Sequence, residues 1–264
     1  MLKRCLVALF TATIVLTLAP QAAAQPSERT MPMRTPDGQP DISGIFTFRT
    51  LTPYQRPEQF EGKETLTAEE AAEFEASERR RQNRDLFDPE LGSGGYRPRS
   101  EGGVLSYNEF WYERGIELTA DKRTSLVIDP PDGRLPPRVQ RPPDPEREQL
   151  TQAEAIARRY DSYENRGTGD RCIMGFNAGP PMRSSAYNNN VMIFQSPGYV
   201  TILNEMVHNA RIIPIGDTAS PPFPQYSGVS RGHWEGETLV VETTRFRGGS
   251  SGLTSPNMHL IERL

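Results

Sequence analysis

The chain has 264 residues, a formal net charge of −4 at pH 7 and 24% charged residues. This mildly acidic balance excludes nucleic acid and anionic lipid as main partners, because both require dense clusters of lysine and arginine. The length suffices for one sizeable core, and 24 prolines with 22 glycines predict a globular protein rich in loops.

The first 24 residues have the organisation of a secretory signal peptide. Lys3 and Arg4 are basic, residues 5–18 form an apolar run, and residues 22–24 (Ala-Ala-Ala) offer a small-residue cleavage site. The apolar run is shorter than the roughly 20 residues that span a bilayer. We therefore expect residues 1–24 to be removed and the protein to be periplasmic or secreted, with no membrane span.

Behind the signal peptide, a proline-rich segment at 25–41 precedes a single β-rich domain expected over 42–264. The segment ends in a turn signal at 35–38 (Thr-Pro-Asp-Gly). Cys172 is the one cysteine that remains after cleavage, so no intramolecular disulfide is expected. A lone cysteine that persists in an oxidising compartment is typically buried, and we expect this of Cys172.

The next segments predict one strand and two helices. Residues 42–50 (ISGIFTFRT) predict a strand; its Gly-Ile-Phe is similar to the Gly-x-Trp of lipocalin-like barrels, and a glycine at a close backbone contact explains it equally well. Capping boxes that begin at Thr67 and Thr151 predict helices near 68–85 and 151–165. Their apolar stripes are narrow, so both helices are expected at the periphery of a core.

Three Pro-Pro pairs lie between the two predicted helices, at positions 130, 136 and 142. A spacing of six residues equals two turns of polyproline II, which would align the pairs on one face of a left-handed helix. A strap packed on the protein's own surface and a docking segment for a partner both fit this pattern.

From residue 191 onward the pattern becomes that of strands. A three-stranded meander, a hairpin and a final strand are predicted at 191–195, 199–207 and 210–215, at 230–234 with 237–246, and from Met258. The fold class is therefore mainly β with two peripheral helices, a β-rich α+β fold on an antiparallel meander wrapped by Pro-rich loops. An incomplete lipocalin-like barrel is one form it can take. The last strand has no successor to pair with, so we expect the chain to be truncated at its C-terminus.

Five long segments of this chain resemble, in the same order, a large family of exported bacterial proteins without an established function. They are YNEFWYERG (107–115), RTSLVIDPPDGRLPP (123–137), DRCIMGFNAGPP (170–181), AYNNNVMIFQSPGYVTILNEMVHNARIIPIG (186–216) and RGHWEGETLVVETTRF (231–246). The resemblance implies export and, in family members, further strands beyond the equivalent of HLIERL. It implies no activity, substrate or catalytic residue.

Candidate catalytic residues are Glu205 and His208, at the end of the most apolar predicted strand, and Arg211, on the predicted strand that follows. Glu205 has two interpretations: a structural carboxylate paired with Arg211 or Arg231, or a general base whose pKa is raised by burial among neighbouring apolar side chains. The histidines, at 208, 233 and 259, lack the short spacing of metal-ligand motifs. No metal site and no cofactor are therefore expected.

Candidate ligand-binding residues combine aromatic, amide and guanidinium groups that suit an aromatic compound. They are Asn108, Trp111, Arg114, Tyr187, Asn188, Asn190, Tyr199, Arg231 and Trp234. A structural turn is the alternative for the asparagine run, and a core anchor is the alternative for Trp111.

These residues predict binding of a small apolar or aromatic compound in a β-sheet pocket. A cofactor-free hydrolase or lyase that uses Glu205, and an envelope interaction protein that uses the Pro-rich strap, remain as alternatives. The sequence sets no oligomeric state.

Overall fold

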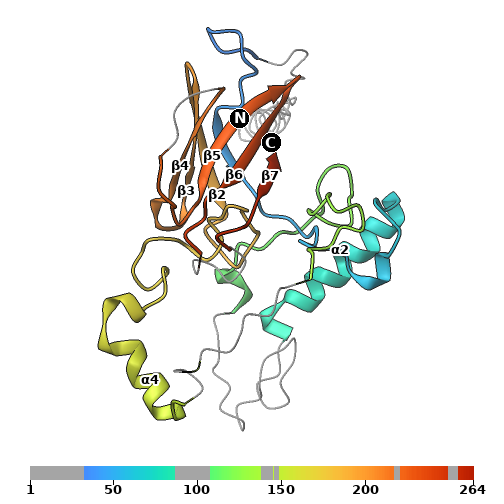
Figure 1. The fold of residues 1–264 in the computed structure, drawn as a ribbon. Helices are drawn as coiled ribbons and strands as arrows, with labels where there is room; N and C mark the ends of the chain where they lie inside the picture. The colour runs from blue at the N-terminus through green and yellow to red at the C-terminus, as the bar shows by residue number, and fades with distance from the viewer. Residues whose placement is uncertain (1–32, 87–107, 138–144, 146–148, 217–220, 249–254) are drawn as a thin grey trace, which may run out of the picture. The chain divides into compact units, whose positions relative to one another are not determined.

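The computed structural model describes residues 33–86, 108–137, 145, 149–216, 221–248 and 255–264 (Figure 1). The chain divides into two compact units, residues 1–40 and residues 41–264. In the first unit, the predicted turn at 35–38 is confirmed: the Gly38 amide donates to the Thr35 carbonyl at 2.8 Å, and Gly38 has a φ of +81° that favours glycine. The predicted signal peptide lies outside the described residues.

The second unit is mainly β, as predicted, and contains two antiparallel sheets. A four-stranded sheet has the order β1-β2-β3-β4, with β1 Gly44–Thr47, β2 Asn190–Ser196, β3 Tyr199–Asn204 and β4 Ala210–Pro214. A three-stranded sheet contains β5 Val229–Glu235, β6 Thr238–Thr244 and β7 Leu260–Arg263. The meander and the hairpin are confirmed. Their tight turns contain Gly198 and Gly236, at φ values of +77° and +64°.

Both sheets contribute side chains to one core, and the described strands do not close into a barrel (Figure 1). Alternate residues of β2, β3, β4 and β6 point into this core: Val191, Val200, Ile202, Ile213, Leu239 and Val241. The sheets meet where the Gly216 amide donates to the Gly232 carbonyl at 3.0 Å. Glycine at 232 favours this close approach, because a Cβ would lie 2.8 Å from the Ile215 side chain and 3.0 Å from that of Ile213. The interior between the sheets is therefore filled by packed side chains.

Both predicted helices form with the expected capping boxes but end earlier than predicted. They are α2 Ala68–Gln82 and α4 Gln152–Asp161, each followed by one extended residue and a short 3₁₀ helix, η2 Arg84–Leu86 or η5 Tyr163–Asn165. The two helices differ in packing. α2 contributes Ala71 to a second core with Leu51, Leu66 and Leu118, whereas no residue of α4 is buried. None of the helices in the described part of the chain is long and apolar enough to cross a bilayer.

Two predictions about the loops are wrong. The first proline pair does not begin a polyproline helix: the Gly133 amide donates to the Pro130 carbonyl at 2.9 Å and closes a turn. Buried Arg56 holds this turn by donating to the Pro131 carbonyl at 3.0 Å, so the strap packs on the protein's own surface here. The third pair lies outside the described residues. Cys172 is exposed rather than buried, because it occupies a tight turn with a φ of +51°.

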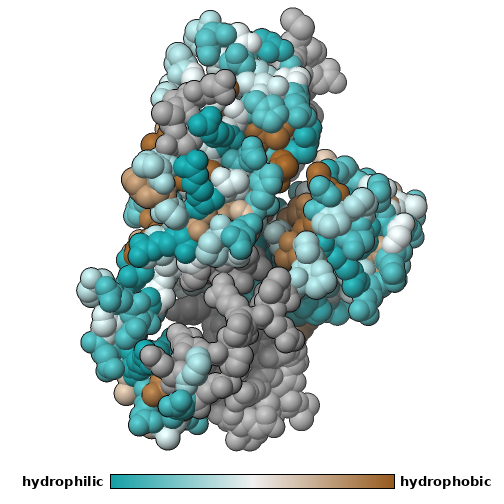
Figure 2. Space-filling model, in the orientation of Figure 1, coloured by the Kyte–Doolittle hydropathy of each residue, from teal (hydrophilic) through white to brown (hydrophobic). Residues whose placement is uncertain are grey.

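Hydrophilic residues predominate on the face of the molecule in Figure 2, and the hydrophobic ones form small separate groups. Scattered apolar residues of this kind are common on protein surfaces.

Candidate functional site

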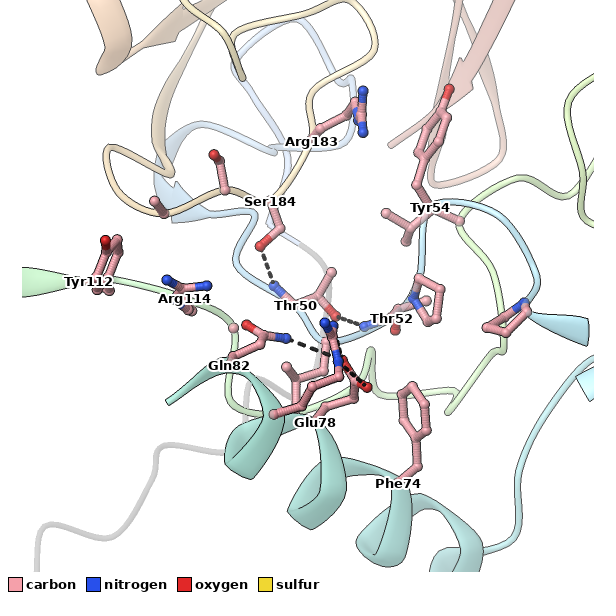
Figure 3. A pocket seen from close by; sticks show the side chains of 18 of the residues that line it. Thr50, Thr52, Tyr54, Phe74, Glu78, Gln82, Tyr112, Arg114, Arg183 and Ser184 are labelled. Carbon is pink, nitrogen blue, oxygen red and sulfur yellow. Dashed lines mark hydrogen bonds and ion pairs between the residues drawn. The ribbon is translucent and has the colours of Figure 1, made fainter. Parts of the chain in front are cut away.

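A cavity of about 940 Å³ lies in the second unit, between α2 and three extended segments (Figure 3). The segments are residues 50–57, 112–115 and 183–187, with Leu126 also on the wall. Among the polar and aromatic lining side chains are Tyr54, Phe74, Glu78, Arg81, Gln82, Tyr112, Arg114, Arg183, Ser184 and Tyr187. This volume lies at the upper end of the range of small-molecule sites.

One stripe of α2 serves both the second core and the cavity. Ala71 and Phe74 pack in the core, and Glu78 and Gln82 follow on the same side of the helix, one and two turns later. Glu78 accepts hydrogen bonds from Arg81 at 2.9 Å (Nε) and 2.6 Å (Nη2). These bonds hold the pKa of Glu78 below its usual range, so its carboxylate neutralises Arg81.

The opposite wall is positioned by two buried asparagine side chains. Asn189 is fully buried; its Nδ2 donates to the carbonyls of Glu113 (3.0 Å) and Ser185 (3.1 Å), and its Oδ1 accepts from the Ser185 amide (2.8 Å). Asn177 donates to the carbonyls of Tyr187 and Asn188 at 3.1 and 2.9 Å. Asn189 thereby joins segment 112–115 to loop 183–187, although the two are about 70 residues apart in sequence.

Arg183 and Tyr54 face each other at one side of the cavity. The guanidinium carbon of Arg183 lies 5.0 Å from the centre of the Tyr54 ring, within the range of a cation–π contact. Burial raises the pKa of Tyr54, and the positive charge of Arg183 only partly opposes this rise. The Arg183 guanidinium has no hydrogen bond or ion pair with any residue that the structure describes.

Arg114 extends the positive character of the cavity from the segment at 112–115. Its guanidinium carbon lies 4.1 Å from the centre of the Tyr112 ring, and its Nε is 3.8 Å from a Glu109 carboxylate oxygen. That distance exceeds hydrogen-bond length, and the buried Nε has no hydrogen-bond acceptor in the described structure. Three arginines and one carboxylate therefore line the cavity; Glu78 pairs with Arg81, Glu109 outside the lining pairs with Arg114, and Arg183 has no described carboxylate partner.

Of the residues predicted from sequence, only Arg114 and Tyr187 line this cavity. Tyr187 lies at the rim, with its ring 5.5 Å from and nearly perpendicular to that of Phe176. The predicted site residues that do not line the cavity are Asn108, Trp111, Asn188, Asn190, Tyr199, Arg231, Trp234, Glu205, His208 and Arg211.

The predicted burial of Glu205 is wrong. β3 ends at Asn204, and the chain turns outward through the 3₁₀ helix η6 Met206–His208, where Val207 and His208 have φ values of +51° and +54°. Glu205 is exposed and accepts a hydrogen bond from Asn190 Nδ2 at 2.9 Å. His208 is exposed as well, so the structure does not provide the buried general base of the catalytic hypothesis.

The predicted pairing of Arg211 with Glu205 is also wrong. Arg211 lies on β4 with only 6% of its surface exposed, and its guanidinium binds both carboxylate oxygens of Glu262 on β7, one of them at 3.3 Å. This ion pair bridges the two sheets. It occupies Arg211 in a structural contact.

The remaining ligand-binding predictions fall on other parts of the fold. Trp111 is 62% exposed beside Phe110, so its interpretation as a core anchor is wrong; the 3₁₀ helix η4 Glu109–Trp111 has no buried residue. Asn108 is exposed at the start of η4. Tyr199, Arg231 and Trp234 lie on strands, and Trp234 packs against the core between the sheets. The contacts of Asn188 and Asn190 match the structural interpretation of the asparagine run.

Sequence reasoning missed Tyr54, Glu78, Arg81 and Arg183. The signal for Glu78 was present, because it continues the spacing of Ala71 and Phe74 on a capped helix. Arg183 and Tyr54 are 129 positions apart, and no local pattern joins them. In the described part of the chain, no group of three His, Cys, Asp or Glu side chains is arranged to hold a metal ion.

Comparison with protein-family models, curated proteins and solved structures finds no match for this chain.

Proposed function

We propose that this protein binds a small aromatic anion, an aromatic carboxylate in the simplest case, in the cavity beside α2. The observation that carries the proposal is Arg183, a cavity-lining guanidinium that has no acceptor or counter-ion among the described residues. Its planar donor set matches a carboxylate in two parallel hydrogen bonds. The proposal keeps the aromatic ligand expected from sequence and moves its site from the sheet to the cavity.

Two further features of the cavity support an aromatic anion. The Tyr54 hydroxyl is protonated at neutral pH, as a tyrosine ordinarily is, and burial raises its pKa further, so it can donate a hydrogen bond to an anion. Tyr112, Tyr187 and Phe74 supply aromatic surface on different walls. Aromatic surface around convergent cationic donors favours a ligand with a ring and one negative group over an aliphatic or cationic ligand.

The place of action follows from the predicted signal peptide, so we propose a periplasmic or secreted binding protein. Fractionation of a bacterial culture that expresses the full chain tests this part. We expect the protein outside the cytoplasm with a mature N-terminus at Gln25. Retention of residues 1–24 on a cytoplasmic protein would contradict export and leave the ligand proposal unaffected.

A thermal-unfolding series with matched ligands tests the binding proposal. Benzoate, 4-hydroxybenzoate and phenylacetate should raise the melting temperature in a saturable manner, because a ligand that binds only the folded state stabilises it. Benzamide has the same ring without the charge and serves as the matched control. Equal shifts with benzoate and benzamide, or no shift with any of the four at constant ionic strength, would contradict the proposal.

A further inference from the structure

A second cluster of positive charge lies away from the cavity, where a loop meets the end of the three-stranded sheet. It consists of Arg171, from the loop that precedes β2, Tyr226, from the segment before β5, and Arg247, just after β6. The backbone fixes the last two side by side. The Gln225 amide donates to the Arg245 carbonyl at 3.1 Å, and the Arg247 amide donates to the Gln225 carbonyl at 2.8 Å.

Arg171 contacts Tyr226 through one hydrogen bond, and its Nε donor has no acceptor among the described residues. Its Nη2 donates to the Tyr226 hydroxyl oxygen at 3.0 Å, and its guanidinium carbon lies 6.0 Å from the ring centre. The buried Nε of Arg171 has no hydrogen-bond acceptor within the described residues. A buried N–H without an acceptor destabilises a fold, so an acceptor from outside the chain is favoured here.

Arg247 brings a second positive charge to the same ring. Its guanidinium carbon lies 4.9 Å from the centre of the Tyr226 ring. Neither Arg171 nor Arg247 forms an ion pair with a carboxylate that the structure describes. Two positive charges beside one ring repel each other, and a bound anion offsets this repulsion.

We infer that Arg171, Tyr226 and Arg247 form a site for a compact dianionic oxyanion, a phosphate or sulfate group, independent of the aromatic-anion cavity. Two guanidinium groups beside one ring supply several N–H donors, and planar donor sets of this kind suit the oxygens of a tetrahedral oxyanion. A dianion also balances both charges, so sulfate and hydrogen phosphate should bind more tightly than acetate or chloride. The bound oxyanion would tie the loop that carries Arg171 to the end of the sheet.

Arg245 provides a matched control two positions from Arg247. Its Nη1 donates to the Pro221 carbonyl at 2.7 Å, and it makes no contact with the Tyr226 ring among the described contacts. Arg245→Gln therefore removes the same charge from the same segment without removing a member of the cluster. Arg183→Gln provides the control for the cavity.

Isothermal titration of the protein with sodium sulfate, at ionic strength held constant with sodium chloride, tests the inference. Arg247→Gln should weaken sulfate binding at least tenfold, because it removes one of two charges, whereas Arg245→Gln and Arg183→Gln should leave it within twofold of wild type. Arg247 is exposed, so its variant should fold; Arg171→Gln, checked for its melting temperature first, should also lose at least tenfold. A second titration with glycerol 2-phosphate distinguishes a free ion from a phosphate group on a larger molecule. If glycerol 2-phosphate binds about as tightly as sulfate, the site accepts a phosphate group on a larger molecule. If it binds more weakly than sulfate, the site takes a free ion; both results support the site.

The inference fails if sulfate gives no saturable heat in the wild-type protein, or if Arg245→Gln lowers the affinity as much as Arg247→Gln. Loss of sulfate binding in Arg183→Gln, with binding intact in Arg247→Gln, would place the oxyanion in the cavity instead. If the wild-type protein binds sulfate as expected but does not bind benzoate, the proposed function is overturned and this inference is supported.

Discussion

Replacement of Asn189 by alanine should lower the free energy of unfolding more than alanine replacement of either other asparagine in the run 188–190. Asn189 is fully buried, and its amide satisfies three backbone groups: the carbonyls of Glu113 and Ser185 and the amide of Ser185. Each group left unsatisfied costs about 1–3 kcal/mol, and water that enters the space recovers part of this, so we expect a loss of about 3–5 kcal/mol in the free energy of unfolding.

Urea unfolding of Asn189→Ala, followed by circular dichroism, measures this loss, and Asn190→Ala is the matched control. Asn190 bonds Glu205 at the surface, so its replacement should cost less than about 1 kcal/mol. Equal effects of the two substitutions, or a loss below about 1 kcal/mol for Asn189→Ala, would refute the argument that buried amide bonds hold segment 112–115 to loop 183–187.

Three other predictions follow from packing and charge. Glu262→Gln should lower the free energy of unfolding by about 3–5 kcal/mol, because it leaves the Arg211 guanidinium buried without its counter-charge; a denaturant midpoint equal to wild type would contradict this. The absorbance difference between wild type and Tyr54→Phe should show a tyrosine that ionises above pH 10, because burial raises the pKa of Tyr54. The stability that neutral Tyr54 contributes should be present below about pH 10 and should be lost as pH rises through its higher folded pKa. An ionisation midpoint at or below pH 10 would argue against burial of Tyr54. Thr67→Ala should cost about 1 kcal/mol of global stability since α2 packs on a core, whereas Thr151→Ala should only reduce helix content in exposed α4; equal global costs would contradict this contrast.

Sequence was a reliable guide wherever the cause of a structure is local. Capping boxes at Thr67 and Thr151 located both helix starts, since the hydroxyl and the carboxylate three residues later satisfy the same amides in any context. Glycines at 198 and 236 marked two hairpin turns, because each adopts a positive φ. The alternation of buried and more exposed residues in β3 follows the strand period of two, whereas β6 buries three consecutive residues, Leu239 to Val241.

The site was much less accessible to sequence, because its partners are distant along the chain. Arg183 lies in the loop that Asn189 joins to Glu113, and Asn189 and Glu113 are 76 positions apart. The contact with Glu113 determines which asparagine of the run is buried, and no local sequence pattern indicates that contact. The burial predicted for Glu205 was wrong for a local reason. The apolar run around Glu205 continues to Val207, but β3 ends at Asn204 and the chain then turns through Val207 and His208, which have left-handed backbone.

Calorimetric titration of benzoate into wild type, Arg183→Gln and Arg80→Gln tests the binding of an aromatic anion most directly. Arg80 lies exposed on α2 and does not line the cavity, so its substitution controls for net charge. A charge-assisted hydrogen bond contributes about 1.5–3 kcal/mol, so Arg183→Gln should weaken benzoate binding roughly tenfold or more, with Arg80→Gln within about twofold of wild type. Saturable benzoate binding that is equally strong in wild type and Arg183→Gln, or no benzoate binding in wild type, would contradict the proposed function.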